Sequence, residues 1–282
     1  MPMETFSGRV AAITGAGSGI GRALARDLAR RGAHLALSDV NETGLAETVA
    51  LCEGNGVKVT SHRVDVADRG AVFAWADQVV AEHGKVNLVV NNAGVALAAT
   101  IDEGSVEDIE WLLGINYWGV VFGTKAFLPH LKEAGEGHIV NLSSVFGLIS
   151  VPTQSAYNSA KFAVRGFTDA LRMELEIADC GVSCTTVHPG GIKTNIARNA
   201  RVDPALEEQA GTREEQARRF ERTALTSPEK AARQILKAVE RDRRRVLVGP
   251  DAKVIDLVSR LPAGLYQRVM VKAAARGAKP VV

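Results

Sequence analysis

The sequence is poor in aromatic residues, in cysteine and in net charge. Phenylalanine, tryptophan and tyrosine make up 5% of its 282 residues, and 34 lysines and arginines face 32 acids. Nucleic-acid binding uses a basic surface or aromatic platforms on which bases stack, so this composition argues against a nucleic-acid partner. Cys52, Cys180 and Cys184 form no CxxC pair. An odd number of scattered cysteines favours reduced thiols in a reducing compartment.

The sequence also has no apolar run long enough to cross a membrane. Its first ten residues lack the basic and apolar regions of a signal peptide. We therefore expect a soluble, cytoplasmic protein. The six histidines show no metal-ligand spacing, so we predict no metal site.

Short apolar stretches alternate with longer amphipathic ones. The short stretches predict strands at 9–14, 34–39, 58–64, 86–91, 138–143, 182–187 and 245–249. Helical periodicity between them predicts an α/β fold: one domain over 1–282, with a doubly wound parallel sheet of about seven strands and helices on both faces. Two segments interrupt the alternation. We expect 195–226 to form a helical lid over the substrate and 250–282 to form a helical tail.

The stretch TGAGSGIG follows the first predicted strand and opens a helix. A glycine turn in this place brings backbone N–H groups and the positive end of the helix up to a diphosphate. Gly15 permits the tight turn, Gly19 permits close approach of the phosphates, and Gly21 permits close packing of helix and strand. The turn predicts a dinucleotide site.

Asp39 ends the second predicted strand, where the ribose hydroxyls of a dinucleotide should lie. A carboxylate accepts hydrogen bonds from a free 2′-hydroxyl and repels a 2′-phosphate, which favours NAD over NADP. Arg22 lies just past the glycines and could attract that phosphate, so NADP remains the alternative.

Tyr157 and Lys161 are four residues apart in a predicted helix and therefore share one face. A phenol has an ordinary pKa of about 10, too high for a base at neutral pH. A nearby ammonium and the positive ring of an oxidised nicotinamide both stabilise the phenolate. The tyrosine could then take a proton from an alcohol, or give one to a carbonyl in the reverse direction. Taken alone, the pair could equally be two surface residues.

Six motifs occur in one order: TGAGSGIG, NNAG at 91–94, Asn116, a serine before VFG, YNSAK, and PGGIKT at 189–194. With them the sequence resembles the short-chain dehydrogenase/reductase family, in its single-domain branch, over about residues 7–249. The resemblance implies a Rossmann-type fold and an NAD(P)-dependent alcohol dehydrogenase or ketoreductase. The tail beyond Gly249 lies outside the resemblance.

The resemblance also implies site residues. It implies that Ser144 hydrogen-bonds the substrate oxygen and that Asn116 anchors a water relay from Lys161. The implied catalytic set is Asn116, Ser144, Tyr157 and Lys161. The implied cofactor residues are Gly15, Ser18, Gly19, Ile20, Gly21, Asp39, Asp65, Val66, Asn91, Ala93, Gly94, Tyr157, Lys161, Pro189, Gly190, Ile192 and Thr194. Alternatively, Asp65 is only a turn residue, and the Asn91 side chain only hydrogen-bonds the backbone at the end of its strand. We interpret Ser143, the neighbour of Ser144, as structural.

The predicted substrate residues are apolar: Val95, Val145, Phe146, Leu148 and Ile149. No arginine accompanies them to hold a carboxylate or phosphate, so we expect an apolar secondary alcohol or ketone as substrate. The resemblance implies a homodimer or homotetramer that pairs the helices of 105–131 and 155–177. The basic, amphipathic tail is expected to pack on this subunit or a neighbour, with contact to a membrane surface as the alternative. A cofactor-binding scaffold without catalysis is a further alternative, which the intact serine, tyrosine and lysine disfavour.

Overall fold

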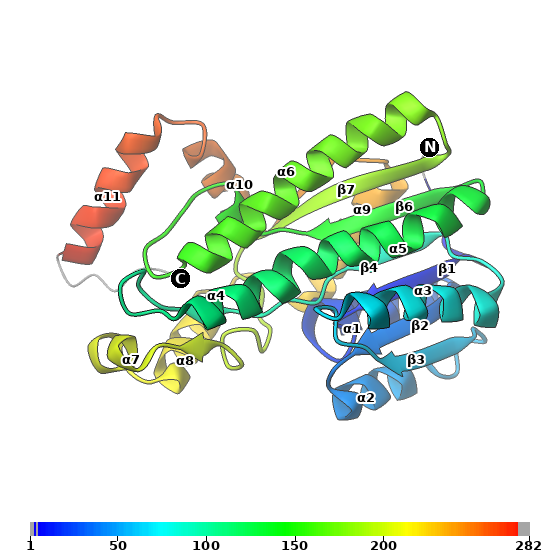
Figure 1. Ribbon diagram of the computed structural model, residues 1–282, viewed down its shortest axis with the longest axis horizontal. Helices are drawn as coiled ribbons and strands as arrows, with labels where there is room; N and C mark the ends of the chain where they lie inside the picture. Colours follow the sequence, from blue (N-terminus) through cyan, green and yellow to red (C-terminus); the bar gives the residue numbers. More distant parts are fainter. Residues whose placement is uncertain (1–2, 4, 276–282) are drawn as a thin grey trace.

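The computed structural model describes residue 3 and residues 5–275. Seven parallel strands form one sheet in the order β3-β2-β1-β4-β6-β7-β9 (Figure 1). The strands are β1 (Val10–Thr14), β2 (His34–Asp39), β3 (Val59–Arg63), β4 (Leu88–Asn91), β6 (Gly137–Leu142), β7 (Val182–Pro189) and β9 (Arg245–Val248). The order reverses between β1 and β4, and such a reversal leaves a crevice at the carboxyl ends of the strands. The predicted doubly wound Rossmann-type sheet is confirmed.

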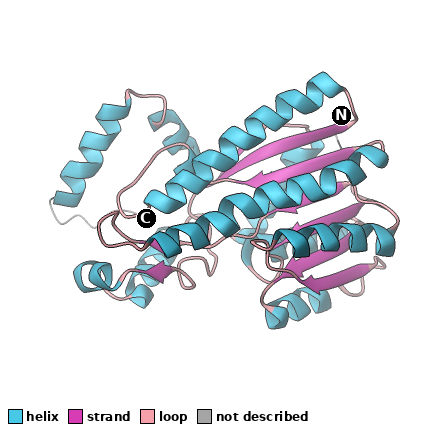
Figure 2. Ribbon diagram, viewed as in Figure 1, coloured by secondary structure: helices cyan, strands magenta, loops and turns pink. Residues whose placement is uncertain are grey.

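Helices cover both faces of this sheet, in layers that Figure 2 shows. One face carries α1 (Gly19–Arg30), α2 (Glu42–Cys52) and α9 (Pro228–Glu240), and the other carries α3 (Arg69–His83), α5 (Gly119–Glu133) and α6 (Ser155–Ala178). Successive strand residues point to opposite faces, so neighbours in β1 enter different cores. Ile13 packs with α1 and α9, while Ala12 packs with α3 and α5.

The region expected to be one helix over 105–131 is three pieces. A π-helical turn, η1 (Gly114–Trp118), joins α4 (Val106–Leu113) to α5. Such turns insert a residue into the helical ladder and are frequent at functional sites. Two short strands that the sequence pattern did not predict also occur: β5 (Leu97–Ala98) pairs in parallel with β8 (Arg201–Val202).

Both interrupting segments are helical in the structure. The insertion contains α7 (Pro204–Ala210) and α8 (Arg213–Thr223), and the tail contains α10 (Pro250–Val258) and α11 (Ala263–Ala275). Residues 276–282 of the expected tail lie outside the described residues. Within the part of the chain that the structure describes, no helix has the length and apolarity to cross a membrane.

Candidate active site

The glycine turn at the end of β1 leaves the first turn of α1 open to a ligand. Ser18 is the N-cap residue of α1, and its side chain makes no capping hydrogen bond. Gly15 and Gly19 have φ angles of +64° and +52°, a region that favours glycine. A Cβ on Gly15 would lie 2.8 Å from Ala93 Cα, so no side chain fits there. Uncapped N–H groups at a helix start suit the diphosphate of a dinucleotide.

Asn92 and Thr14 fix the position of this turn. The Asn92 amide donates to the carbonyls of Thr14 (2.9 Å) and Gly15 (3.1 Å), while Thr14 Oγ1 accepts from the Asn92 and Ala93 N–H groups at 3.0 Å each. A Cβ on Gly21 would lie 2.2 Å from the Gly15 oxygen. The turn is therefore held by the hydrogen bonds of Asn92 and Thr14 and by the close approach of Gly21 to Gly15. Sequence reasoning did not single out Asn92.

The structure places the neighbouring Asn91 differently from the cleft position implied by the resemblance. Its side chain is buried and donates to Asn141 Oδ1 at 2.8 Å and Thr124 Oγ1 at 3.2 Å. Strand residues alternate between faces, so the two adjacent asparagines cannot both reach the turn. The Asn91 side chain joins the core network beneath β4, and Asn92 is the one that touches the glycine turn.

Asp39 lies beside the glycine turn, as expected. Its Oδ2 accepts from Gly17 N at 2.8 Å and its Oδ1 from Asn41 N at 2.9 Å. Each carboxylate oxygen keeps acceptor capacity for a ribose hydroxyl. Arg22 donates instead to the carbonyls of Gly17 and Gly44 and pairs with Glu47. Because these contacts occupy the guanidinium, it is not free to bind a 2′-phosphate.

Asp65 and Val66 occupy the loop after β3. The Asp65 Oδ1 accepts from Ala67 N at 2.9 Å, a local turn contact. Val66 is buried, and a Cβ on Gly119 would lie 2.8 Å from Val66 Cγ2. The two residues therefore shape the loop next to η1.

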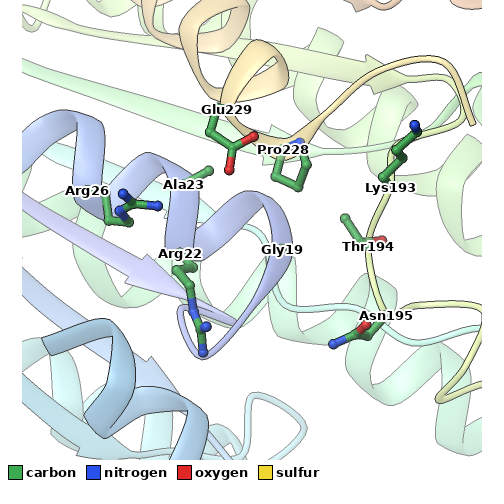
Figure 3. A pocket seen from close by; sticks show the side chains of 9 residues that line it. All are labelled: Gly19, Arg22, Ala23, Arg26, Lys193, Thr194, Asn195, Pro228 and Glu229. Atoms are coloured by element: carbon green, nitrogen blue, oxygen red, sulfur yellow. The ribbon is translucent and has the colours of Figure 1, made fainter. Parts of the chain in front are cut away.

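A cavity of about 140 Å³ lies beside the first turn of α1 (Figure 3). Thr194 faces Gly19 across it, with Thr194 Cγ2 3.0 Å from a Cβ placed on that glycine. Figure 3 shows the Arg22 side chain turned away from Thr194, consistent with its bonds to the turn. The cavity thus lies beside the glycine turn and Thr194, on the expected side for a cofactor. Its lining residues are Gly19, Arg22, Ala23, Arg26, Lys193, Thr194, Asn195, Pro228 and Glu229.

Ser144, Tyr157 and Lys161 come together at the carboxyl end of β6. The Ser144 side chain lies close enough to the Tyr157 phenol to act on its pKa, and Lys161 Nζ lies 5.5 Å from the centroid of the tyrosine ring. Desolvation raises the pKa of Tyr157 to about 12, although the side chain is only partly buried, and the Ser144 side chain opposes this rise. The sequence led us to expect a lowered pKa, and the chain's own residues do not produce it.

Lys161 is almost fully buried in the wall of the site. Burial lowers its pKa to about 8, and Nζ donates to the Leu142 carbonyl at 3.0 Å. Ser143 Oγ donates to the Lys161 carbonyl at 2.8 Å, so Ser143, the neighbour of Ser144, has a structural contact. Both bonds tie α6 to the end of β6.

Asn116 lies in the π-helical turn, where its side chain points at the segment after β4. Its Oδ1 accepts from Val95 N and its Nδ2 donates to the Val95 carbonyl, each at 2.8 Å. A Cβ on Gly94 would lie 3.2 Å from Asn116 Oδ1 and 3.7 Å from Lys161 Nζ. The irregular turn thus brings Asn116 near Lys161, and the water relay stays a prediction.

His188 is a residue of this site that sequence reasoning missed. It is fully buried near the end of β7, and the distance from Nδ1 to the Ser144 carbonyl oxygen is 2.9 Å. Nδ1 must carry the proton in this contact, because a carbonyl only accepts. Burial lowers the pKa of His188 to about 4, which keeps the ring neutral at physiological pH. In the sequence, the available signal for this residue was its place in the dipeptide His188–Pro189, directly before the two glycines of PGGIKT.

The PGGIKT loop is held by the tail. Asp251, in the first turn of α10, accepts through Oδ2 from Gly191 N at 2.6 Å. A Cβ on Gly190 would lie 2.1 Å from the same oxygen. Ile192 forms an isolated bridge with Thr226. Because the tail lay outside the family resemblance, nothing in the sequence indicated this role for Asp251.

The predicted substrate residues separate into two groups. Phe146 lies in η2 (Val145–Gly147), with its ring edge-to-face with Tyr157 at 6.1 Å between centroids. Val95 is partly buried beside Asn116. The other three are buried: Val145, Leu148 and Ile149.

A family model described as short chain dehydrogenase matches residues 9–205. The chain belongs to this family. It is 53% identical over 275 residues to the "Putative oxidoreductase SadH" of Mycobacterium tuberculosis, covering 97% of this chain and 98% of that protein. Short-chain dehydrogenases are oxidoreductases, and this chain is therefore one of them.

Two solved structures of the short-chain dehydrogenase fold bear on the cofactor. A short-chain dehydrogenase/reductase from Burkholderia phymatum in complex with NAD superposes with a TM-score of 0.83 at 34% identity, over 92% of this chain and 94% of that one. An alcohol dehydrogenase from Thermococcus sibiricus complexed with 5-hydroxy-NADP gives 0.68 at 29% identity, over 84% and 94%. Similar chains are thus found with either type of nicotinamide cofactor.

Proposed function

We propose that this short-chain dehydrogenase is an NAD-dependent oxidoreductase that interconverts an apolar secondary alcohol and its ketone. The observation that carries the proposal is the grouping of Ser144, Tyr157 and Lys161 at the carboxyl end of β6. This grouping faces the same sheet edge as the uncapped start of α1. A proton-transfer group and a dinucleotide site at one edge suit oxidation of an alcohol.

In the oxidation direction, Ser144 donates a hydrogen bond to the alcohol oxygen and Tyr157 takes the hydroxyl proton. NAD, when bound, would supply the acceptor for the hydride of the carbinol carbon. The charge of the Lys161 ammonium, 5.5 Å from the ring centroid, together with the positive nicotinamide ring of a bound oxidised cofactor, would favour the phenolate form of Tyr157 against the desolvation that raises its pKa. In the reverse direction the neutral phenol returns the proton to the ketone oxygen, which Ser144 steadies as negative charge develops on it.

The preference for NAD rests on Asp39 and on the engaged side chain of Arg22. An Asp39 carboxylate close to Gly17 repels a 2′-phosphate, and Arg22 is bound to the turn and to Glu47. We expect Asp39→Ala to lower the ratio of kcat/KM for NAD over that for NADP at least tenfold, because the repulsion is removed. Wild-type enzyme that turns over NADP faster than NAD would favour the alternative, an NADP-dependent carbonyl reductase.

The apolar substrate class rests on Phe146 beside Tyr157 and on the apolar segment around it. The proposed homodimer or homotetramer rests on exposed apolar side chains on the helices expected to pair. Trp118 is 49% exposed, Met173 55% and Ile177 86%. The cytoplasmic location remains a prediction from the sequence.

The proposal is tested by following the absorbance of reduced cofactor with a series of secondary alcohols of increasing chain length. We expect turnover with NAD, with kcat/KM rising as apolar length increases, since each buried methylene contributes about 0.8 kcal/mol. Ser144→Ala tests the site: it should cut kcat at least a hundredfold while cofactor binding is kept. Cofactor binding with no turnover of any alcohol or ketone would instead indicate a silent scaffold.

A further inference from the structure

The tail helices α10 and α11 are fixed beside the substrate side of the site. Asp251 of α10 holds the loop of Gly190 and Gly191, and the Tyr266 hydroxyl of α11 accepts from Ser150 N at 3.3 Å. Ser150 follows η2, the turn that carries Phe146. Figure 1 shows α11 standing out from the domain at the end toward which the strands point. The tail is therefore placed next to the turn that carries Phe146, whose ring packs edge-to-face on Tyr157.

Apolar side chains run along the outer side of both helices at helical spacing. Val254 and Leu257 of α10 are three residues apart and are 63% and 68% exposed, and Leu261, in the segment between the two helices, is 46% exposed. Leu265 and Val269, four apart, are 51% and 61% exposed. Single exposed apolar residues are ordinary, whereas a row at helical spacing marks an interaction surface.

The inner side of α11 contacts the body through other residues. Tyr266 and Met270 are half-buried, while the other side chains described between residues 264 and 272 are exposed. The outer row therefore does not pack on this subunit. The tail thus contacts this subunit through Asp251 and Tyr266, while its outer row is exposed and could be covered by a neighbour or by a membrane.

The charges of the tail are also divided between the two sides. Asp251 is bonded to the loop, and Asp256 is buried and paired with Arg245 and Arg260. Exposed cations remain beside the apolar row at Lys253, Arg268 and Lys272. The sequence of α11 contains no acidic residue. The outer side of the tail is therefore apolar and cationic.

We propose that the outer side of α10 and α11 docks on an anionic lipid bilayer. Apolar side chains of such a helix enter the acyl boundary while its cations meet the phosphate headgroups. Docking there would bring η2, whose Phe146 ring packs on Tyr157, close to a bilayer surface, so that a lipophilic alcohol could reach the site without crossing water. That last step rests on the proposed function, but the docking surface does not.

A second copy of this chain is a poorer occupant. If two tails paired through this side, the shared interface would hold Arg268 and Lys272 of both copies. No acid on the outer side of α11 would compensate, and facing like charges are repulsive. An anionic bilayer supplies the missing negative charge.

The test is flotation of the full-length protein with vesicles, without cofactor or substrate. Vesicles of pure phosphatidylcholine are compared with vesicles that contain about a third phosphatidylserine. We expect binding to the anionic vesicles that weakens as salt is raised. The double variant Arg268→Gln/Lys272→Gln should bind about 25-fold more weakly, from roughly fivefold for each cation.

The matched control is Arg233→Gln/Lys237→Gln, which removes two exposed cations with the same spacing from α9. It should bind as wild type does. Equal loss in both doubles, or no binding of wild type at low salt, would overturn the proposal. So would a Leu265→Gln/Val269→Gln variant that keeps vesicle binding and instead dissociates an oligomer in light scattering. Turnover of a short, water-soluble alcohol by all variants separates this outcome from failure of the proposed reaction.

Discussion

Replacing Lys161 by methionine should stabilise the fold while it abolishes activity. Burial lowers the pKa of this lysine from 10.5 to about 8. A difference of about 2.5 in pKa corresponds to about 3 kcal/mol of unfavourable burial of the charged form at pH 7. Methionine keeps the length of the side chain, but it loses the bond to the Leu142 carbonyl, which is worth about 1 kcal/mol. We therefore expect a net gain of about 2 kcal/mol at pH 7.

The gain should depend on pH in a defined way. Below pH 8 the lysine is protonated in both folded and unfolded states, so the cost of burying its charge is fully present. Between about pH 8 and 10.5 the folded state loses this proton first, and the stability of wild type rises relative to the variant. Above pH 10.5 both states are neutral and the advantage of the variant should be gone.

Urea unfolding of both proteins at pH 7, 8, 9 and 10 measures this difference. Titrations shared by the two proteins, those of His138 and His188 included, cancel in the comparison. A Lys161→Met variant that is less stable than wild type at pH 7 would refute the reasoning. So would a stability difference that does not shrink above pH 8.

Two further substitutions test residues that hold the site. His188→Leu removes the N–H that is donated to the Ser144 carbonyl. Because one hydrogen bond is lost, kcat should fall by up to about tenfold while the affinity for cofactor is unchanged. His188→Asn places an amide N–H where Nδ1 lies and should recover most of that loss; equal loss in both variants would contradict a positioning role. Gly21→Ala puts a Cβ 2.2 Å from the Gly15 oxygen and should therefore displace the turn. We expect the Kd for cofactor, measured by calorimetry, to rise at least tenfold. An unchanged Kd would show that the turn can move without loss of binding.

Local patterns were enough to predict the sheet, the glycine turn and the tyrosine–lysine pair. Each depends on residues close in sequence: a strand followed by glycines, or two side chains one helical turn apart. The contact of His188 with Ser144 spans 44 residues and follows from the pairing of β6 with β7, in which Leu142 lies opposite Val187. The HP dipeptide before the glycines marks the position of His188, but no local pattern indicates its partner.

The same reason explains the other residues that were missed. Asp251 reaches Gly191 across 60 residues, and its part of the chain has no counterpart in the family motifs. Asn91 was expected in the cleft, but Asn92 is the asparagine that contacts the glycine turn. Which of the two does so depends on where β4 ends, and sequence patterns place the ends of strands least reliably. The π-helical turn within 105–131 likewise accompanies two bonds between Asn116 and Val95, which are 21 residues apart and which helical periodicity does not indicate.

The central claim, that Tyr157 transfers the proton, is tested most directly by Tyr157→Phe across the pH range. With NAD and a secondary alcohol, kcat/KM of wild type should rise with pH to a plateau, with an apparent pKa well below the value of about 12 that burial imposes on this tyrosine in the free chain. The phenylalanine variant should bind NAD as wild type does and lose activity by a factor of roughly 10² to 10⁴ at every pH. A variant that kept the wild-type rate and the wild-type pH profile would contradict the account.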